Sequence, residues 1–324
     1  MHDLAVITIS TNEAHWLTPC LGSIFAKQGD ISMDVVVADN MSTDGTRELV
    51  ESEFPAARVV TVANHGFSHA NNRALMTCDA RWVLFINPDT EILHGTFADL
   101  VRKADAAGDL GLVGVRQVLA DGTLHPTIRY FPNALRTLAE ALGSERLPRR
   151  PGRWLGEREL DLSLYDREVE CDWTSGSFML ARREALESSG FLDERFFIYS
   201  EETDLCLRIK KAGWRIIHDP TMTIVHHADK AGIQAKGEAQ NNYTRMQYAR
   251  KHFSPAHRAA YWSALVLRFG LRTVLAPSRD AQERRRLRGV YRFVLETLFG
   301  RRGAPYQDPP PVAVRTRQTS PPEG

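Results

Sequence analysis

The chain has 324 residues and a formal net charge of +1, with 43% hydrophobic and 25% charged residues. This length is enough for about two domains, or for one α/β domain with a large appendage. No apolar run is long enough to cross a bilayer, and the first residues lack the regions of a signal peptide. The four cysteines are scattered without a C-x-x-C pair, which argues against a zinc site or a disulfide framework and favours a cytoplasmic location.

Short apolar segments alternate with helix-like segments over the first third of the chain. The spacing predicts strands over residues 4–9, 34–38, 58–62, 81–86 and 112–115. It predicts helices over residues 16–26, 46–53, 68–76 and 96–107. Such alternation is typical of βαβ units, which build a mostly parallel sheet covered by helices. The expected fold class is therefore α/β.

The remainder of the chain is less regular. Residues 122–170 are rich in proline, arginine and glycine, so we expect loops and short elements there. Order is expected to return over residues 173–181. The elements predicted after this segment are helices over 182–189 and 201–212, and short strands over 215–217 and 223–225. From Pro305 onward the composition is typical of a disordered tail.

Polar segments follow three of the predicted strands, at residues 10–13, 39–46 and 87–91. In an open parallel sheet such strand ends meet at one crevice, where ligands bind. A dinucleotide-binding domain would need a glycine-rich turn in the first segment, and residues 10–13 contain no glycine. A divalent cation, which binds carboxylate and phosphate oxygens, can replace such a turn. Asp89 is the best-placed ligand for it.

Six motifs resemble those of the inverting family-2 glycosyltransferases, and the resemblance covers about residues 4–253. The motifs are DNMSTDGT (39–46), NHGFS (64–68) with Asn71 and Asn72, NPD (87–89), GFLDERFF (190–197), EETDLCLR (201–208) and VHH (225–227). Residues 121–124 and 129–132 are most similar to bacterial rhamnosyltransferases. The resemblance implies a GT-A fold, Rossmann-like with a mostly parallel sheet and flanking helices, followed here by a C-terminal helical extension.

The resemblance also implies a binding site for the donor nucleotide. Asp39 would accept the imide N–H of uracil or thymine, and Thr11 would line the same pocket. Asp44 and Asn71 would contact the nucleotide or its sugar. Asn87 occupies the first position of the metal-binding tripeptide, where relatives often have an acid.

The metal implied by the resemblance is Mg²⁺ or Mn²⁺. Asp89 would be its direct ligand, and His226, which follows a late strand, would complete the protein's share of the site. Because the protein offers few ligands, the donor's own phosphates would have to supply others. Metal binding without nucleotide should therefore be weak.

The catalytic base implied by the resemblance is Glu202. Relatives commonly have Asp at this position, and the extra methylene moves the carboxylate by about one bond length, so Asp204 is kept as a second candidate. Glu201 and Asp204 would lie near the acceptor or the transferred sugar. Trp173 would stack on a sugar ring, and Gly176 would allow close approach of the backbone.

The C-terminal region is strongly basic, because residues 284–302 hold seven arginines and one acid. A helix there would gather arginines on one face and an apolar stripe on another, made of Leu287, Val290, Tyr291, Val294 and Leu298. A second apolar stripe lies within residues 261–269. The stripes could dock on an anionic membrane, or they could pack on the catalytic domain and leave the arginines in solvent. No known nucleic-acid-reading module accompanies these arginines.

The expected organisation is a catalytic domain over residues 1–253, a basic helical extension over 254–303 and a disordered tail over 304–324. The expected reaction is inverting transfer of L-rhamnose, from dTDP-rhamnose or another dTDP- or UDP-sugar, to a cell-envelope glycan or a polyprenyl-diphosphate-linked saccharide. The enzyme would work at the inner face of the cell membrane. Two alternatives are a sugar nucleotidyltransferase and a non-catalytic glycan-binding protein descended from a transferase.

Overall fold

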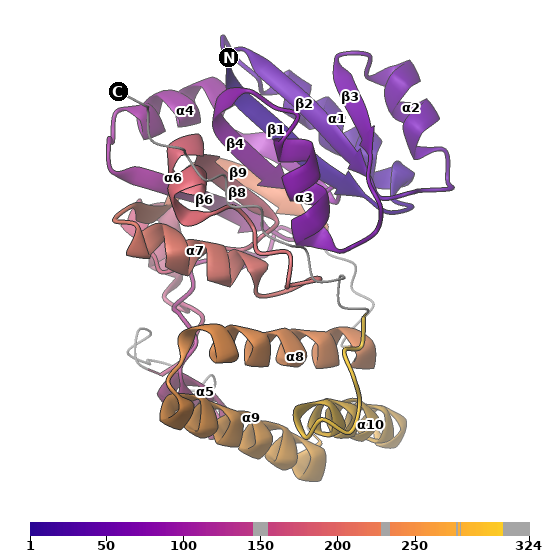
Figure 1. Cartoon of the computed structure of the whole chain (residues 1–324), viewed down its shortest axis with the longest axis vertical. Helices are drawn as coiled ribbons and strands as arrows, with labels where there is room; N and C mark the ends of the chain where they lie inside the picture. The colour runs from indigo at the N-terminus through magenta and orange to yellow at the C-terminus, as the bar shows by residue number, and fades with distance from the viewer. Residues whose placement is uncertain (145–154, 228–233, 277, 279, 307–324) are drawn as a thin grey trace, which may run out of the picture.

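The computed structural model describes residues 1–144, 155–227, 234–276, 278 and 280–306. Figure 1 shows a sheet with helices on both faces and, below it, a separate layer of long helices. The α/β class expected for the first part of the chain is confirmed. Most of the tail expected to be disordered, residues 307–324, lies outside the described residues.

The described residues form one nine-stranded sheet with the order β3-β2-β1-β4-β8-β6-β9-β5, and β7 pairs with β9. The five predicted strands are present as β1 (His2–Ser10), β2 (Met33–Asp39), β3 (Ala57–Thr61), β4 (Ala80–Ile86) and β6 (Leu110–Val118). The others are β5 (Thr90–His94), β7 (Val169–Glu170), β8 (Phe178–Arg182) and β9 (Arg215–His226). Strands β1 to β4 are parallel to one another, so the carboxyl ends of β1, β2 and β4 share one edge.

The two short strands predicted over 215–217 and 223–225 are one strand, β9. Its pairing with β6 shifts register between Asp219, which pairs with Val115, and Thr223, which pairs with Arg116. Pro220 lies inside this shift and has no N–H to donate to a ladder. The proline therefore bends one continuous strand instead of separating two.

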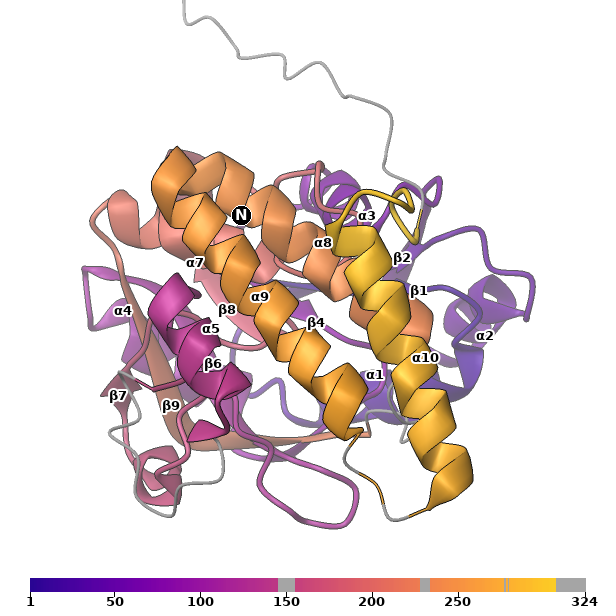
Figure 2. The ribbon, with the colours of Figure 1, turned by 90° about the horizontal axis from the view of Figure 1, so that it is seen from below.

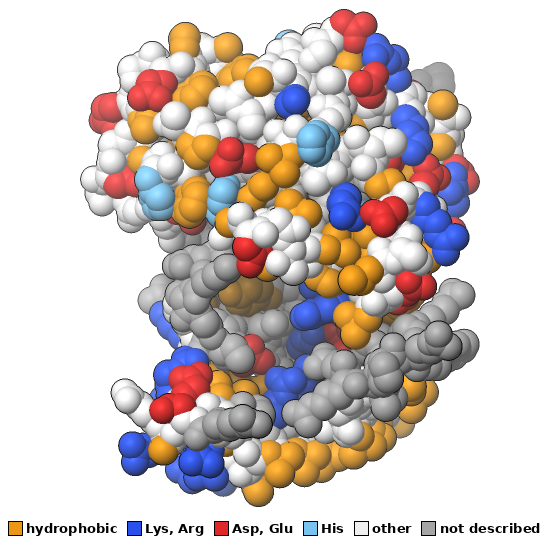
Figure 3. Space-filling model, turned by 180° about the vertical axis from the view of Figure 1, so that it is seen from behind, with side chains coloured by type: hydrophobic (Ala, Val, Ile, Leu, Met, Phe, Trp, Pro, Cys, Tyr) orange, Lys and Arg blue, Asp and Glu red, His pale blue; other side chains and the backbone are white. Residues whose placement is uncertain are grey.

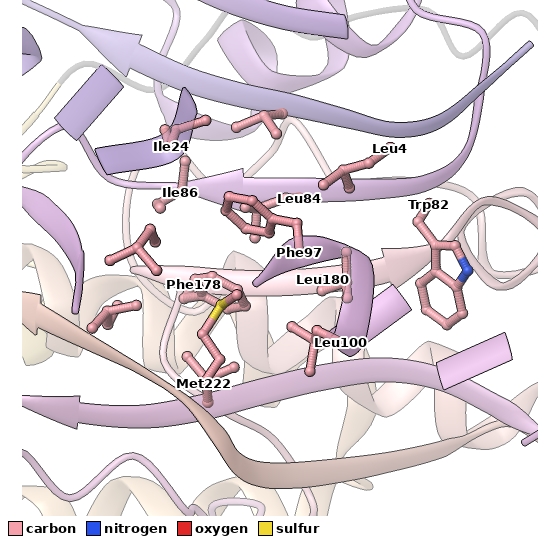
Figure 4. Close-up of a cluster of buried hydrophobic side chains, with 14 of the residues drawn as sticks. Leu4, Ile24, Trp82, Leu84, Ile86, Phe97, Leu100, Phe178, Leu180 and Met222 are labelled. Atoms are coloured by element: carbon pink, nitrogen blue, oxygen red, sulfur yellow. The ribbon is translucent and has the colours of Figure 1, made fainter. Parts of the chain in front are cut away.

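Six helices of the described residues cover the sheet. Helices α1 (Ala14–Ala26), α2 (Thr46–Glu53) and α4 (Phe97–Asp105) bury apolar residues in one hydrophobic cluster. Helices α3 (Phe67–Leu75), α6 (Arg183–Ser189) and α7 (Glu201–Lys211) do so in a second cluster on the other face. Figure 4 shows the first cluster, in which Leu84, Phe97 and Phe178 pack between the strands and α4. The sheet is buried on both faces, so its strands are nearly continuous apolar runs.

The second layer contains α5 (Ala134–Ala141), α8 (Ala235–His252), α9 (Pro255–Leu275) and α10 (Ala281–Leu298). In Figure 2, α5 and α10 flank α9 on the face seen from below. Helix α5, capped by Asn133, and the 3₁₀ helix η2 (Leu162–Asp166) lie in the segment predicted as loops and short elements. Helix α8 precedes the expected boundary at residue 253, yet it shares a hydrophobic cluster with α9 and α10.

The apolar stripe of α10 is buried inside the protein. Leu287, Val290, Tyr291 and Val294 are each at most 7% exposed and pack against α8 and α9. The arginines of the opposite face, among them Arg285 and Arg288, are exposed. Of the two alternatives for this stripe, packing within the protein is the one that the structure supports.

Candidate active site

A pocket of about 510 Å³ opens at the carboxyl ends of β1, β2 and β4, and we call it the donor pocket. It is completed by residues 175–177 and by the segment that leads into α7. The predicted site residues that line it are Thr11, Asn87, Asp89, Gly176, Glu201, Glu202 and His226. The fold therefore gathers in one cavity side chains that lie far apart in sequence, from Thr11 to His226, as expected for the edge of a parallel sheet.

Strand pairing brings Asp89 and His226 together. Thr90 pairs with His226 across β5 and β9, and the His227 N–H donates to the Asp89 carbonyl at 2.8 Å. Nε2 of His226 lies 3.3 Å from Oδ2 of Asp89. Neighbouring ligands of an octahedral ion with bonds of about 2.1 Å lie about 3 Å apart, so both atoms can bind one ion. Oδ1 of Asp89 and Nδ1 of His226 are buried without a hydrogen-bond partner among the described residues.

The neighbouring histidine is held away from this pair. Nε2 of His227 lies 2.6 Å from Oε1 of Glu91, and the His227 ring stacks on Trp16 with ring centroids 4.8 Å apart. Within the described part of the chain, no group of three His, Cys, Asp or Glu side chains could hold an ion alone. Asp89 and His226 can therefore anchor a metal only if other ligands, such as phosphate oxygens and water, complete its shell.

Strained backbone surrounds the donor pocket. The non-glycine residues Asn12, Met41, Tyr199 and Ser200 have φ between 58° and 72°. Each such residue costs about 1 kcal/mol or more, and strain of this kind clusters at functional sites. Gly66, with φ of +98°, is required because a Cβ there would lie 2.3 Å from the Phe197 carbonyl oxygen. The loop before α7 is thereby fixed against the loop before α3.

Glu201 and Glu202 begin α7 and project into the pocket from its floor. One carboxylate oxygen of each, Oε2, is buried without a hydrogen-bond partner among the described residues. Burial, followed by the negative charge of Glu202, raises the pKa of Glu201 well above its usual value. Burial also raises the pKa of Glu202, while Arg129 and Arg245 oppose the shift. A carboxylate left unpaired at this depth is costly, which favours a chemical role over a purely structural one.

A second pocket of about 380 Å³ adjoins the first, and we call it the arginine pocket. Its charged lining consists of Arg129, Glu157, Arg158, Glu202, Glu238, Arg245, Arg268 and Arg272. Figure 3 shows basic side chains in the hollow between the sheet and the helical layer. Ser175, Tyr199 and Glu202 line both pockets. Glu202 therefore stands where two binding cavities meet.

Trp173 and Gly176 lie on opposite sides of this junction. Trp173 is 9% exposed and lines the arginine pocket; its Nε1–H donates to the Tyr130 carbonyl at 3.0 Å. The Arg129 guanidinium lies over its ring, 5.5 Å from the centroid. A Cβ on Gly176 would meet only Glu202, at 3.8 Å, so the protein alone does not require glycine there. Glycine leaves open space beside the Glu202 carboxylate.

Three residues expected at the nucleotide are not in the pocket lining. Asp44 accepts hydrogen bonds from Ala14 N–H and from Thr46, at the starts of α1 and α2. Burial alone would raise the pKa of Asp44, but these hydrogen bonds lower it. Asn71 is 1% exposed and donates to the Phe67 carbonyl within α3. Their side chains take part in the geometry of the helix starts, and their contacts with the nucleotide stay predictions. Asp39 is buried at the end of β2 and accepts from Ser42 N–H, so its role with the base stays a prediction.

Asp204 is also placed away from the pockets, contrary to its expected position near the acceptor. Its side chain is fully buried, and its oxygens contact Arg208 Nε at 2.8 Å, Lys251 Nζ at 2.6 Å and His252 Nε2 at 2.7 Å. Burial alone would raise its pKa, but these three partners lower it. Asp204 thus ties α7 to α8, and it has no free oxygen to act as the alternative base.

Some site residues escaped the sequence prediction. Glu13 lines the donor pocket, and burial together with the charge of Asp89 raises its pKa. Its place in the glycine-free segment after β1 was the available signal. Arg129 and Arg245 line the arginine pocket. Arg129 belongs to the segment 129–132 that resembles rhamnosyltransferases, but a site role could not be assigned to either arginine, because α8 and the segment between β6 and α5 meet only in the folded chain.

The sheet order, the acidic pocket at its carboxyl edge and the metal-compatible pair together define a GT-A-like glycosyltransferase. The family model described as glycosyl transferase family 2 matches residues 5–188, more than half of the chain. The chain belongs to this family.

The relatives agree with this class. An N-acetylglucosaminyl-diphospho-decaprenol L-rhamnosyltransferase of Mycobacterium tuberculosis is 30% identical over 312 residues, which cover 92% of this chain and 98% of the relative. The rhamnosyltransferase WbbL of Escherichia coli is 23% identical, over 69% of this chain and 83% of that protein. The resemblance to bacterial rhamnosyltransferases is confirmed, and the alternatives of a nucleotidyltransferase and a non-catalytic protein are not supported.

Solved structures confirm the GT-A fold. A mannosyltransferase from Pyrobaculum calidifontis, in complex with GDP-Man and Mn²⁺, superposes with a TM-score of 0.57 at 18% identity, covering 92% of this chain and 86% of that one. Staphylococcus aureus TarS 1–349, in complex with UDP-GlcNAc, gives 0.53 at 17% identity, with 91% and 81% covered. At these identities the similarity concerns the fold alone.

Proposed function

We propose that this glycosyltransferase transfers a sugar from a nucleotide diphosphate to a hydroxyl of an acceptor in one displacement with inversion. The position of Glu202 is the observation that carries this proposal, because it lines both the donor pocket and the arginine pocket. A base between two cavities can take the proton of an acceptor hydroxyl while that oxygen attacks a donor sugar from the other side. Gly176 leaves room for the sugar beside the carboxylate.

In this proposal Asp89 and His226 hold Mg²⁺ or Mn²⁺. When bound, the ion neutralises charge on the departing diphosphate. The lining of the donor pocket indicates why a cation is needed. Among the described residues it contains no lysine or arginine, but it contains four acids: Glu13, Asp89, Glu201 and Glu202. A diphosphate would be repelled from such a cavity without a cation. Binding of the metal and the donor should therefore be strongly coupled.

The protein's own contribution to the chemistry is a buried base in a fixed position. The acceptor O–H proton passes to the Glu202 carboxylate as the new C–O bond forms and the bond to the diphosphate breaks. Burial raises the pKa of Glu202, which makes its carboxylate a stronger proton acceptor than an exposed glutamate.

The proposed donor is dTDP-L-rhamnose, and the proposed acceptor is a lipid-linked saccharide diphosphate. Support comes from the names of the relatives, since the mycobacterial protein is named for transfer of L-rhamnose to N-acetylglucosaminyl-diphospho-decaprenol. That relative and this chain match over nearly their whole lengths. The arginine pocket also has the charge that an acidic acceptor would need.

We further propose that the enzyme docks on an anionic bilayer through α5 and α9. No helix in the described part of the chain is long and apolar enough to cross a membrane. Leu135, Leu138 and Leu142 of the α5 segment and Val274 and Leu275 of α9 are nevertheless between 37% and 72% exposed. Figure 3 shows apolar side chains along the lower edge of this layer, and Figure 2 shows α10 beside α9. Exposed arginines of α10 next to an apolar face are complementary to anionic lipid.

The test is transfer of labelled sugar from dTDP-L-rhamnose or a UDP-sugar to N-acetylglucosaminyl diphosphate on a lipid tail, with Mn²⁺, Mg²⁺ or EDTA. We expect transfer that requires the ion and that Asp89→Ala abolishes. Donor binding measured by calorimetry should weaken in EDTA for the wild type but not for Asp89→Ala. Binding that is indifferent to the metal would refute the metal site, and absence of transfer from every sugar nucleotide would refute the reaction.

A further inference from the structure

The arginines of the arginine pocket differ in how their charges are paired. Arg245 is paired with Glu157, with an Nη2 to Oε2 distance of 2.6 Å, and Arg268 with Glu140 at 2.6 Å. Arg129 forms no ion pair with any carboxylate of the described residues, and its Nε is buried without a hydrogen-bond partner among them. Its guanidinium lies over the face of the Trp173 ring.

An uncompensated guanidinium at this depth is expensive. Burial and the neighbouring charge of Arg158 lower the pKa of Arg129 to about 10, so it is still charged at neutral pH. A charge in this position that lacks a partner is destabilising, and a bound anion would offset this cost. The guanidinium fork binds phosphate oxygens in pairs, and the Trp173 ring holds its plane in place.

We propose that the arginine pocket binds the diphosphate group of the acceptor, with Arg129 and Arg272 as ligands, and thereby places the acceptor sugar at Glu202. This inference rests on the proposed transfer reaction for the identity of the acceptor. The diphosphate of the donor would bind in the donor pocket instead, because Asp89 and His226, the proposed metal ligands, lie there. The two pockets thus use different means for the same chemical group: a cation between carboxylates in one, and arginines in the other.

The positions of the residues fit an acceptor that enters between the layers. Arg129 lies between β6 and α5, Arg272 lies on α9, and Glu202 lies at the start of α7. On α8, Glu238, Asn241, Asn242 and Arg245 face the same cavity at helical spacing. A sugar between Glu202 and Arg129 would have hydrogen-bonding amides beside it, and its diphosphate would lead toward α9, which carries the exposed apolar face.

The test is calorimetric binding of farnesyl diphosphate, a diphosphate with a short lipid tail, in saturating dTDP and Mn²⁺ so that the donor pocket is already filled. We expect Arg129→Gln to weaken binding about 10- to 100-fold, Arg272→Gln to weaken it less, and Arg129→Lys to recover part of the affinity. Arg102→Gln removes an arginine from an exposed ion pair far from the pockets and should change nothing. Farnesol, which lacks the diphosphate, should bind all variants equally poorly.

Three outcomes would overturn the inference. They are no binding of farnesyl diphosphate to the wild type, wild-type affinity in both Arg129→Gln and Arg272→Gln, and displacement of farnesyl diphosphate by dTDP. If Arg129→Gln fails to fold, the more accessible Arg272→Gln decides by itself. The assay involves no transfer, so it judges the pocket even if the proposed reaction fails. Where transfer is observed, Arg129→Gln should raise KM for the diphosphate acceptor about tenfold or more and leave KM for the donor unchanged.

Discussion

The donor pocket and the arginine pocket share Glu202 but are built in opposite ways. The donor pocket lies at the edge of one sheet, and its residues follow strands that the sequence pattern locates. The arginine pocket lies between layers, and its residues come from the segment before β7, from α7, α8 and α9. The donor pocket is acidic and suits a bound cation, whereas the arginine pocket is basic and suits a bound anion.

The difference shows how a transferase can keep two diphosphates apart. Each pocket selects its ligand by charge, so the metal-bound donor and an acidic acceptor would not compete for one site. The junction at Glu202 is then the only place where the two ligands meet. If this division holds, changes in one pocket should leave binding in the other unaltered, while changes at Glu202 should spare binding and stop transfer.

The largest effect is expected at the junction. Glu202→Gln removes the proton acceptor but keeps the size of the side chain, so we expect kcat to fall about 10³- to 10⁴-fold with donor affinity unchanged. Glu202→Asp, which restores the acid one methylene shorter, should recover part of the rate. The measurement is initial-rate transfer, with donor binding measured in parallel.

Equal turnover in Glu202→Gln and wild type would move the base to another group. Glu201→Gln is the matched control, because it changes the neighbouring buried carboxyl. It should reduce turnover far less than Glu202→Gln does, since Glu201 lines the donor pocket only.

A second prediction concerns the connection between the two layers. Asp204→Asn leaves Arg208 and Lys251 without their buried carboxylate, so we expect a loss of about 3 kcal/mol in the free energy of unfolding. Denaturant unfolding measures it. Asp166→Asn, which breaks the exposed pair with Arg116, should cost less than about 1 kcal/mol. A folded Asp204→Asn of wild-type stability that has lost transfer would restore Asp204 as a catalytic candidate.

The contrast between the pockets also shows how much of the candidate site could be predicted from the sequence. Asp89 is predicted from its position after a strand, whereas the resemblance to the family implies His226 and Glu202. Asp44 and Asp204 carry the same local signals, yet they cap helices or form ion pairs, because an acid at a helix start has the same appearance in either role. Only the folded environment distinguishes them.

The helical layer was less predictable for a related reason. The apolar stripe of α10 was compatible with a membrane or with a protein core, since both bury one face of an amphipathic helix. Its true partners, α8 and α9, could not be assigned from periodicity. The same holds for Arg129, because Arg245 on α8 and Arg272 on α9, which line the same pocket, lie more than a hundred residues away in sequence. Long-range packing, not local pattern, decides these contacts.

The pH dependence of transfer gives a smaller effect that tests the junction. Glu202 must be ionised to accept a proton, and burial raises its pKa. Turnover should therefore fall as the pH is lowered through this raised pKa, up to tenfold per pH unit, with the midpoint above the usual glutamate value. Glu184→Gln, an exposed change on α6, should leave the profile unaltered. Turnover that stays constant as the pH is lowered to the usual glutamate pKa would contradict a buried glutamate base.

The smallest effect is expected at the far side of the helical layer, where an acceptor lipid would leave the arginine pocket. Leu135→Ser with Leu142→Ser removes two exposed side chains from the α5 segment, so we expect binding to anionic phospholipid vesicles to weaken about 3- to 10-fold. Leu162→Ser on η2 is the matched control, because that leucine is 56% exposed but lies outside this layer. Vesicle sedimentation measures the binding, and neutral vesicles show the share contributed by the α10 arginines. If the double variant binds like the control while Arg285→Gln with Arg288→Gln does not, the membrane contact is electrostatic and α5 has no part in it. Transfer to a short-tailed, detergent-dissolved acceptor should stay unchanged in all of these variants, because their side chains line neither pocket.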